Sequence, residues 1–416
     1  MDYKEALKKV QKLLKNAELG NVKLDETQNR LVFRGDHSPL GFYGEESVRL
    51  FIKTVDVLWK VDKEIYGTYT LKTFEKSFVK FLVKAKQDEE CSDETLKAFF
   101  RDLRSVEVKK YEILYAVFGA RYYKGQPLKI GTFTLYNPRI HRKHLLEKYP
   151  HSELMLAVAF DPSDNDEEAE KIEVVVGVTE EARESDRAAE KARAHLQQFE
   201  NTMRFMLGRE DTEEYDIGVF NFNEIKRTRG VLLSDTHATI TSRMKGAFNP
   251  ILLHKYPIND SQYGHDKLWE MLKKENPTDL EKRIISAVSW IGKGLRDEEP
   301  ARAFVQYVFA LEALLQIQQD VLVSPSITYS ISEMAAFILG KDLETCLDIE
   351  KVAKEVYSKR SAIAHGSSQE VDSLLLKDAL WLIKSLITVL ITDERFKDFK
   401  RIDDIRDWIK NKKYSS

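Results

Sequence analysis

The hydrophobic pattern of this chain changes its period twice, and this constrains the fold more than any other feature of the sequence. Residues 1–105 place apolar side chains three and four positions apart, as in Glu45 to Val61 and Leu71 to Lys86, which indicates helices. From about residue 106 the pattern changes to short apolar runs, and from about residue 278 it returns to helical spacing. We therefore expect an α+β protein that is mostly helical, built from three regions.

The middle region, residues 106–270, is predicted to be a mixed α/β domain. Short runs rich in Val, Ile, Leu and aromatic residues are punctuated there by Gly, Pro and Asn, which is typical of strands. The predicted strands are Tyr111 to Phe118, Leu128 to Leu135, Leu154 to Phe160, Ile172 to Val178, Tyr215 to Phe222 and Gly230 to Leu233. A helix is expected over Ala182 to Leu207, because Gly208 provides a favourable end.

The third region, residues 278–416, is predicted to be a helical bundle. Thr278 and Glu281 have the spacing of a capping box, in which each side chain bonds the backbone N–H of the other residue. The main helices expected after this cap are Ala301 to Gln318, Thr345 to Ala364 and Leu374 to Thr392. Short links between helices favour antiparallel neighbours in a bundle.

The charge and cysteine content limit the environment of the chain. The net charge is only −3, so any contact with RNA must come from a local basic patch. Two cysteines, Cys91 and Cys346, cannot build a disulfide framework, and the amphipathic N-terminus lacks the apolar core of a signal peptide. The apolar run Leu374 to Thr392 contains three charged residues, which would be costly in lipid. We therefore expect a cytoplasmic protein without a membrane partner.

The segment from Val356 to Gly366 carries the best candidate for a catalytic site. Arg360 continues the apolar stripe of Ile349, Val352 and Val356, and arginine is rarely buried without a partner or a cleft to line. His365 follows five residues later, about 140° around an ideal helix. The two side chains can therefore cooperate if the helix distorts near Gly366, or if a second copy of the chain supplies the complement.

Arginine and histidine together suit the cleavage of RNA by its own 2′-hydroxyl. The imidazole of His365 can act as acid or base near neutral pH, and the guanidinium of Arg360 can hold phosphate oxygens. This chemistry requires no metal ion and no cofactor. The alternative is a structural charge cluster that holds the bundle together or lies in a dimer interface without cleaving anything.

The sequence of this region resembles the HEPN superfamily of ribonucleases. The R-x4-H spacing in RSAIAHG resembles the HEPN signature, and the upstream stretches SWIGKGL and AFVQYVFALEALL resemble its Apea-like branch. The resemblance covers about 120 residues, and it implies a C-terminal HEPN-like bundle whose Arg360 and His365 form a composite site in a homodimer. It also implies that Ser361 and Glu312 support the site.

The resemblance implies a metal-independent endoribonuclease in prokaryotic antiviral defence or growth arrest. RNA is the expected partner, and the larger N-terminal portion is expected to bind an unknown trigger or to restrain the nuclease. The second hypothesis is a non-catalytic HEPN-like module for dimerisation or RNA binding in a regulatory protein. Cofactors and metal ions are expected in neither case.

Overall fold

The computed structural model describes residues 3–20, 30–34, 38–160, 172–208, 216–220, 226–233, 238–245, 250–316, 327–364 and 370–414. Helices predominate over short strands in this part of the chain, which confirms the predicted mostly helical α+β class. The chain packs as two compact units, residues 1–113 with 179–194, and residues 114–178 with 195–416. The predicted middle region and the predicted C-terminal bundle thus lie largely within one unit.

The first unit is mainly helical, with one small antiparallel sheet. Its elements are α1 (Tyr3–Lys15), β1 (Ala17–Leu19), β2 (Arg30–Phe33), β3 (Leu40–Tyr43), α2 (Glu45–Val61), α3 (Lys63–Thr68), α4 (Leu71–Gln87) and α5 (Asp93–Ser105). The strand order is β1-β3-β2. The predicted helices Glu45 to Val61 and Leu71 to Lys86 are confirmed as α2 and α4.

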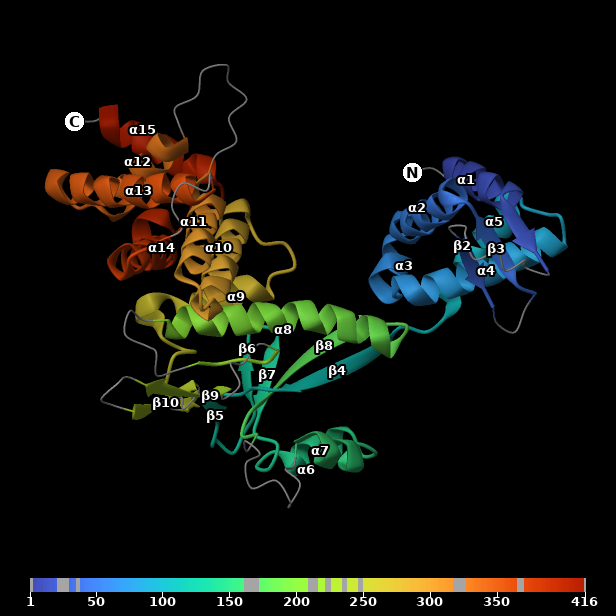
Figure 1. Ribbon diagram of the computed structural model, residues 1–416, viewed down its shortest axis with the longest axis horizontal. Helices are drawn as coiled ribbons and strands as arrows, with labels where there is room; N and C mark the ends of the chain where they lie inside the picture. Colours follow the sequence, from blue (N-terminus) through green and yellow to red (C-terminus); the bar gives the residue numbers. More distant parts are fainter. Residues whose placement is uncertain are drawn as a thin grey trace. The chain divides into compact units, whose positions relative to one another are not determined.

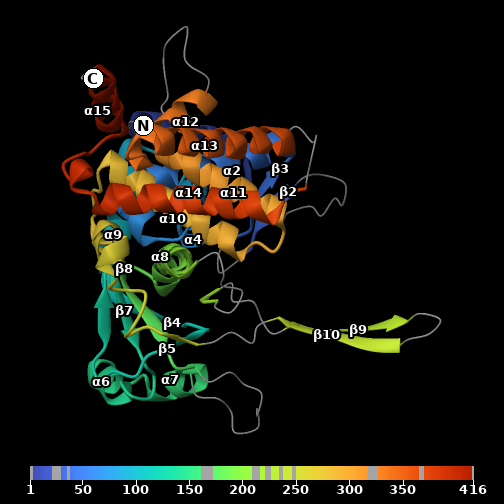
Figure 2. The same ribbon diagram turned by 90° about the vertical axis from the view of Figure 1, so that its left-hand side faces the viewer.

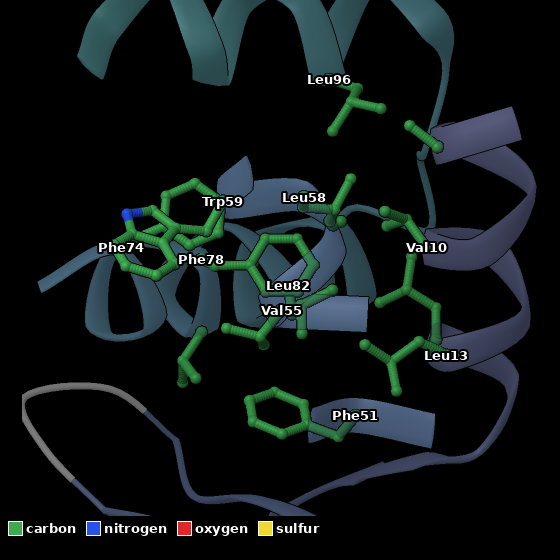
Figure 3. Packing of buried hydrophobic residues seen from close by; sticks show 14 of the residues in the cluster. Val10, Leu13, Phe51, Val55, Leu58, Trp59, Phe74, Phe78, Leu82 and Leu96 are labelled. Carbon is green, nitrogen blue, oxygen red and sulfur yellow. The ribbon is translucent and has the colours of Figure 1, made fainter. Parts of the chain in front are cut away.

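The first unit is held together by an aromatic and aliphatic core and by one buried cation. Phe51 and Phe74 are among its fully buried side chains, and Figure 3 shows them with the aliphatic residues of α1, α2 and α4. Arg183 is also buried, and its guanidinium donates to the backbone carbonyls of Arg104 and Val106. Such an arginine joins segments that are distant in the sequence, because its fork of donors satisfies several acceptors at once.

The second unit contains most of the larger sheet and the second half of the helix that covers it. The sheet strands are β4 (Lys109–Ala116), β6 (Leu128–Ile130), β7 (Phe133–Tyr136) and β8 (Val175–Ala182), in the order β4-β8-β7-β6. Gly131 has a φ of +55° in the β6–β7 turn, a conformation that favours glycine. The helix α8 (Ser185–Leu207) follows β8, and its second half lies between the sheet and the bundle (Figures 1 and 2).

Smaller elements complete this unit. They are β5 (Ala120–Arg121), α6 (Arg142–Lys148), α7 (Glu153–Phe160), β9 (Lys226–Leu233), β10 (Ala238–Lys245) and β11 (Ile251–Leu252). β9 and β10 form an antiparallel hairpin that extends from the rest of the unit (Figure 2). β5 and β11 pair in parallel.

Three of the strand predictions were wrong in whole or in part. Leu128 to Leu135 is not one strand but the hairpin of β6 and β7, because the chain turns at Gly131. Leu154 to Phe160 forms most of the helix α7. Its seven consecutive apolar residues show neither the helical nor the strand period, so periodicity does not identify the element. Leu, Met and Ala favour a helix. Within Tyr215 to Phe222, the described residues 216–220 make only an isolated bridge, between Gly218 and Phe118. Ile217 and Val219 alternate with Asp216 and Gly218, so this pattern alone does not distinguish an isolated bridge from a full strand.

The C-terminal part of the second unit is helical, and residues 278–416 form the predicted helical bundle after η1 and α9. Its elements are η1 (Ser261–Tyr263), α9 (His265–Lys273), α10 (Asp279–Arg296), α11 (Pro300–Leu315), α12 (Ile327–Leu339), α13 (Leu343–Ala364), α14 (Ser373–Thr392), η2 (Glu394–Phe396) and α15 (Ile402–Tyr414). The capping box of Thr278 and Glu281 is confirmed at the start of α10. None of the described helices combines the length and apolar character that a membrane-crossing segment requires.

The bundle contacts α8 at a close approach between two backbones. Ser289 Oγ on α10 donates to Gln198 Oε1 on α8 at 2.8 Å. One turn further along each helix, Gly292 faces Asn201. A Cβ atom at Gly292 would lie 2.3 Å from the Asn201 carbonyl oxygen and 2.5 Å from its Cα atom. This contact therefore requires glycine at residue 292, because the backbone atoms of Asn201 cannot rotate away as a side chain could.

We expect Gly292→Ala to lower the free energy of unfolding of this unit by about 3 kcal/mol, because the added methyl group forces α10 away from α8. Gly67→Ala is the matched control, since residue 67 is also helical and its Cβ would meet nothing within 4 Å. Urea denaturation followed by circular dichroism measures both effects. If Gly292→Ala is as stable as the wild type, the backbones of α10 and α8 do not approach this closely.

Candidate functional site

Arg360 lies near the end of α13, where it continues the buried face of that helix. The helix buries Ile349, Ala353 and Val356 at spacings of four and three residues, so Arg360 falls on the same stripe. The predicted stripe used Val352, which is only half-buried. The side chain of Arg360 keeps 30% of its surface exposed, so it reaches the edge of the bundle and remains accessible to a ligand.

Among the described residues, Arg360 pairs with the carboxylate of Glu312, on α11. The Arg360 Nη2 and Glu312 Oε1 atoms are 3.5 Å apart, and the Glu312 side chain is 16% exposed. This separation gives electrostatic attraction without a short bidentate bond, which would occupy two donors of the fork. Glu312 therefore holds the guanidinium in place and leaves most of its donors available.

The same carboxylate oxygen accepts a second interaction from α13. Tyr357 lies one turn before Arg360, and its hydroxyl donates to Glu312 Oε1 at 2.9 Å. Burial and this hydrogen bond raise the pKa of Tyr357 to about 12. The phenol thus stays protonated at neutral pH and remains a donor to Glu312, so it is a poor proton acceptor for chemistry at this site.

An aromatic ring supports the face of the guanidinium. The Arg360 Cζ atom lies 5.9 Å from the ring centroid of Phe309, which is one turn before Glu312 on α11. Phe309 in turn contacts Trp290 of α10 edge-on, with ring centroids 5.2 Å apart. A cation over an aromatic face is attracted by the ring quadrupole, so this contact limits the orientations that the guanidinium can adopt.

The remaining donors of Arg360 define what the site can bind. Among the described residues, no acceptor hydrogen-bonds the guanidinium, apart from the long contact to Glu312. The Glu312 carboxylate holds one edge of the guanidinium and the Phe309 ring supports one face. The other edge of the guanidinium is exposed to solvent. This arrangement favours an oxyanion such as a phosphodiester.

The other predicted residues are placed as follows. Ser361 follows Arg360 on α13 and is half-buried, and its supporting role stays a prediction. His365 and Gly366 lie outside the described residues, since α13 is described as far as Ala364. The structure therefore brings Arg360 and Glu312 together.

No protein-family model, curated protein or solved structure matches this chain. The part of the chain that the structure describes also contains no group of three His, Cys, Asp or Glu side chains that could hold a metal ion. The features that point to a function are therefore the geometry around Arg360 and the sequence motif that contains it.

Sequence reasoning missed Tyr357 and Phe309. Each lies three residues before a predicted site residue on the same helix, Tyr357 before Arg360 and Phe309 before Glu312. This spacing places the two members of each pair on one helix face, which is a signal that could have identified them. Helical spacing does not show that these two faces meet, because that depends on how α11 packs against α13.

Proposed function

We propose that this protein is a metal-independent endoribonuclease of the HEPN type, acting as a homodimer. The observation that carries the proposal is the guanidinium of Arg360, which is fixed by Glu312 and Phe309 and has an open edge. It lies five residues before His365 in the chain, within the R-x4-H motif. A cation that is available to a phosphate, together with a histidine that transfers protons, is the minimum set of groups that 2′-hydroxyl attack requires.

The proposed roles follow from the chemistry of each side chain. His365 acts as general acid or base, since the attacking hydroxyl must lose a proton and the leaving oxygen must gain one. Arg360 stabilises the negative charge that develops on the phosphate. Glu312 and Ser361 position these groups, and a second copy of the chain completes the site, as the wide angle between residues 360 and 365 on an ideal helix suggests.

The biological setting that we propose is prokaryotic antiviral defence or growth arrest in the cytoplasm. The half-buried thiols of Cys91 and Cys346 are both free, which is compatible with a reducing compartment. The larger N-terminal portion, which includes the first unit with its own hydrophobic core, would recognise the trigger or restrain the nuclease. RNA is the proposed substrate.

The deciding experiment is a digest of total RNA by the full-length protein with EDTA present. We expect the wild type to cleave RNA and to leave a 2′,3′-cyclic phosphate and a 5′-hydroxyl, because the 2′-oxygen is the nucleophile. His365→Ala should reduce the rate of RNA cleavage by at least about 100-fold, the minimum expected when a general acid–base catalyst is removed. His151→Ala is the matched control, because His151 is exposed and lies outside the helical bundle.

A second function is favoured by the contacts between the helices. Glu312 contacts both Tyr357 and Arg360, so it joins α11 to α13. Such a contact would also be expected in a non-catalytic module for dimerisation or RNA binding, where Arg360 has a structural role. RNA binding without cleavage, equal in the wild type and in His365→Ala, would support this module and exclude the nuclease.

A further inference from the structure

A cavity of about 550 Å³ lies in the second unit, away from Arg360. It is formed by three segments that are distant in the sequence: the end of α8 with Gly208, residues 256–265, and the face of α14 from Leu380 to Val389. Its volume falls within the range of small-molecule sites, about 300–1,000 Å³. No residue of the cavity belongs to the proposed nuclease site.

Aromatic rings form much of the wall. Tyr263 stacks on the ring of His265 with centroids 5.8 Å apart, and Tyr256 and Phe205 contact the same imidazole at 6.4 and 6.3 Å. Trp381 of α14 also lines the cavity and keeps 44% of its surface exposed. Flat rings that remain partly exposed can stack on a planar aromatic ligand.

His265 gives this wall one defined hydrogen-bonding group. The residue is 4% exposed, and its Nδ1–H donates to the Pro257 carbonyl at 2.8 Å. Burial lowers the pKa of His265, so the ring is neutral at pH 7, and its Nε2 atom carries a lone pair. No described residue hydrogen-bonds this Nε2 atom, which is therefore able to accept from a ligand.

The cation in the cavity is already used by the fold. Lys384 Nζ donates to the backbone carbonyls of Phe205 and Gly208, at the end of α8. It also lies 5.3 Å from the ring centroid of Phe205. A lysine that satisfies the last carbonyls of a helix is a structural cation, so the cavity favours an uncharged ligand over an anion.

We propose that this cavity binds a planar, uncharged heteroaromatic ring that stacks on Trp381 and Tyr263 and donates a ring N–H to His265 Nε2. An indole-type ring and a nucleobase both have this chemistry. A nucleobase also carries ring nitrogens that accept, and the hydroxyls of Ser385 and Thr388 on α14 are the donors available to them. The site is independent of the proposed nuclease activity.

Equilibrium dialysis of the full-length protein with indole, 1-methylindole and adenine tests the proposal. We expect indole to bind about 5-fold more tightly than 1-methylindole, because only indole can donate to His265. Adenine binding more tightly than indole would identify the ligand as a base, and weaker binding would identify an indole-type ring. Absence of binding by both indole and adenine at millimolar concentration would overturn the proposal.

Three variants assign binding to the cavity. Trp381→Ala should weaken indole binding about 10-fold by removing the stacking surface. His265→Asn keeps an N–H for the Pro257 carbonyl but lacks the Nε2 acceptor, so indole and 1-methylindole should then bind equally. Tyr414→Ala is the control, since Tyr414 is an exposed aromatic residue outside the cavity. Unchanged indole binding by folded Trp381→Ala protein would refute the site, even if His265→Asn does not fold.

Discussion

Arg360→Ala should reduce the rate of RNA cleavage by about 100- to 1,000-fold, the loss that follows removal of one preorganised donor to a developing oxyanion. The variant should keep its fold, because Arg360 is partly exposed and its pairing with Glu312 at 3.5 Å contributes at most about 1 kcal/mol. Arg360→Lys should recover only part of the rate, since an ammonium lacks the planar fork. Single-turnover cleavage of a labelled RNA measures each rate.

Two further variants separate catalysis from general charge effects. Arg401→Ala removes an exposed arginine elsewhere in the bundle and should cleave as the wild type does. Tyr357→Phe removes the hydroxyl that donates to Glu312, and we expect a loss of about 5-fold, since Glu312 keeps its contact with Arg360. If Arg360→Ala cleaves RNA at the wild-type rate, Arg360 is a structural residue and does not bind the phosphate.

Arg204→Met should lower the free energy of unfolding of the second unit by about 3–5 kcal/mol, the cost of breaking a buried ion pair on one side. Arg204 is 4% exposed, and its Nη1 atom lies 2.7 Å from Oε1 of the fully buried Glu200. Its Nε also donates to Asp216 Oδ1 at 3.2 Å. Methionine retains much of the volume but leaves the Glu200 carboxylate without its nearest cation.

The double variant Arg204→Met with Glu200→Gln provides the comparison. It removes both charges, so we expect it to be more stable than Arg204→Met alone. Urea denaturation followed by tryptophan fluorescence reports mainly on this unit, which contains Trp269, Trp290, Trp381 and Trp408. Equal stability of Arg204→Met and the wild type would show that the buried network contributes nothing to the fold.

Local sequence signals predicted the helices well and the short strands less well. The three- and four-residue periodicity located α2 and α4, and the Thr278 capping box located the start of α10, because these signals depend on residues within one or two turns. The apolar run Leu154 to Phe160 was misassigned because it contains no period. Its Leu, Met and Ala residues favour the helix that the structure shows.

The sequence by itself determined that Arg360 continues an apolar stripe and lies five residues from His365, and its resemblance to HEPN proteins matched Glu312 to a supporting position. Only the tertiary structure decided that α11 and α13 bring Glu312, Phe309 and Tyr357 around that arginine. The cavity beside His265 likewise exists only where three distant segments meet. Helical periodicity shows which residues share a face of one helix, whereas the partner of each face is chosen by packing between segments far apart in the chain.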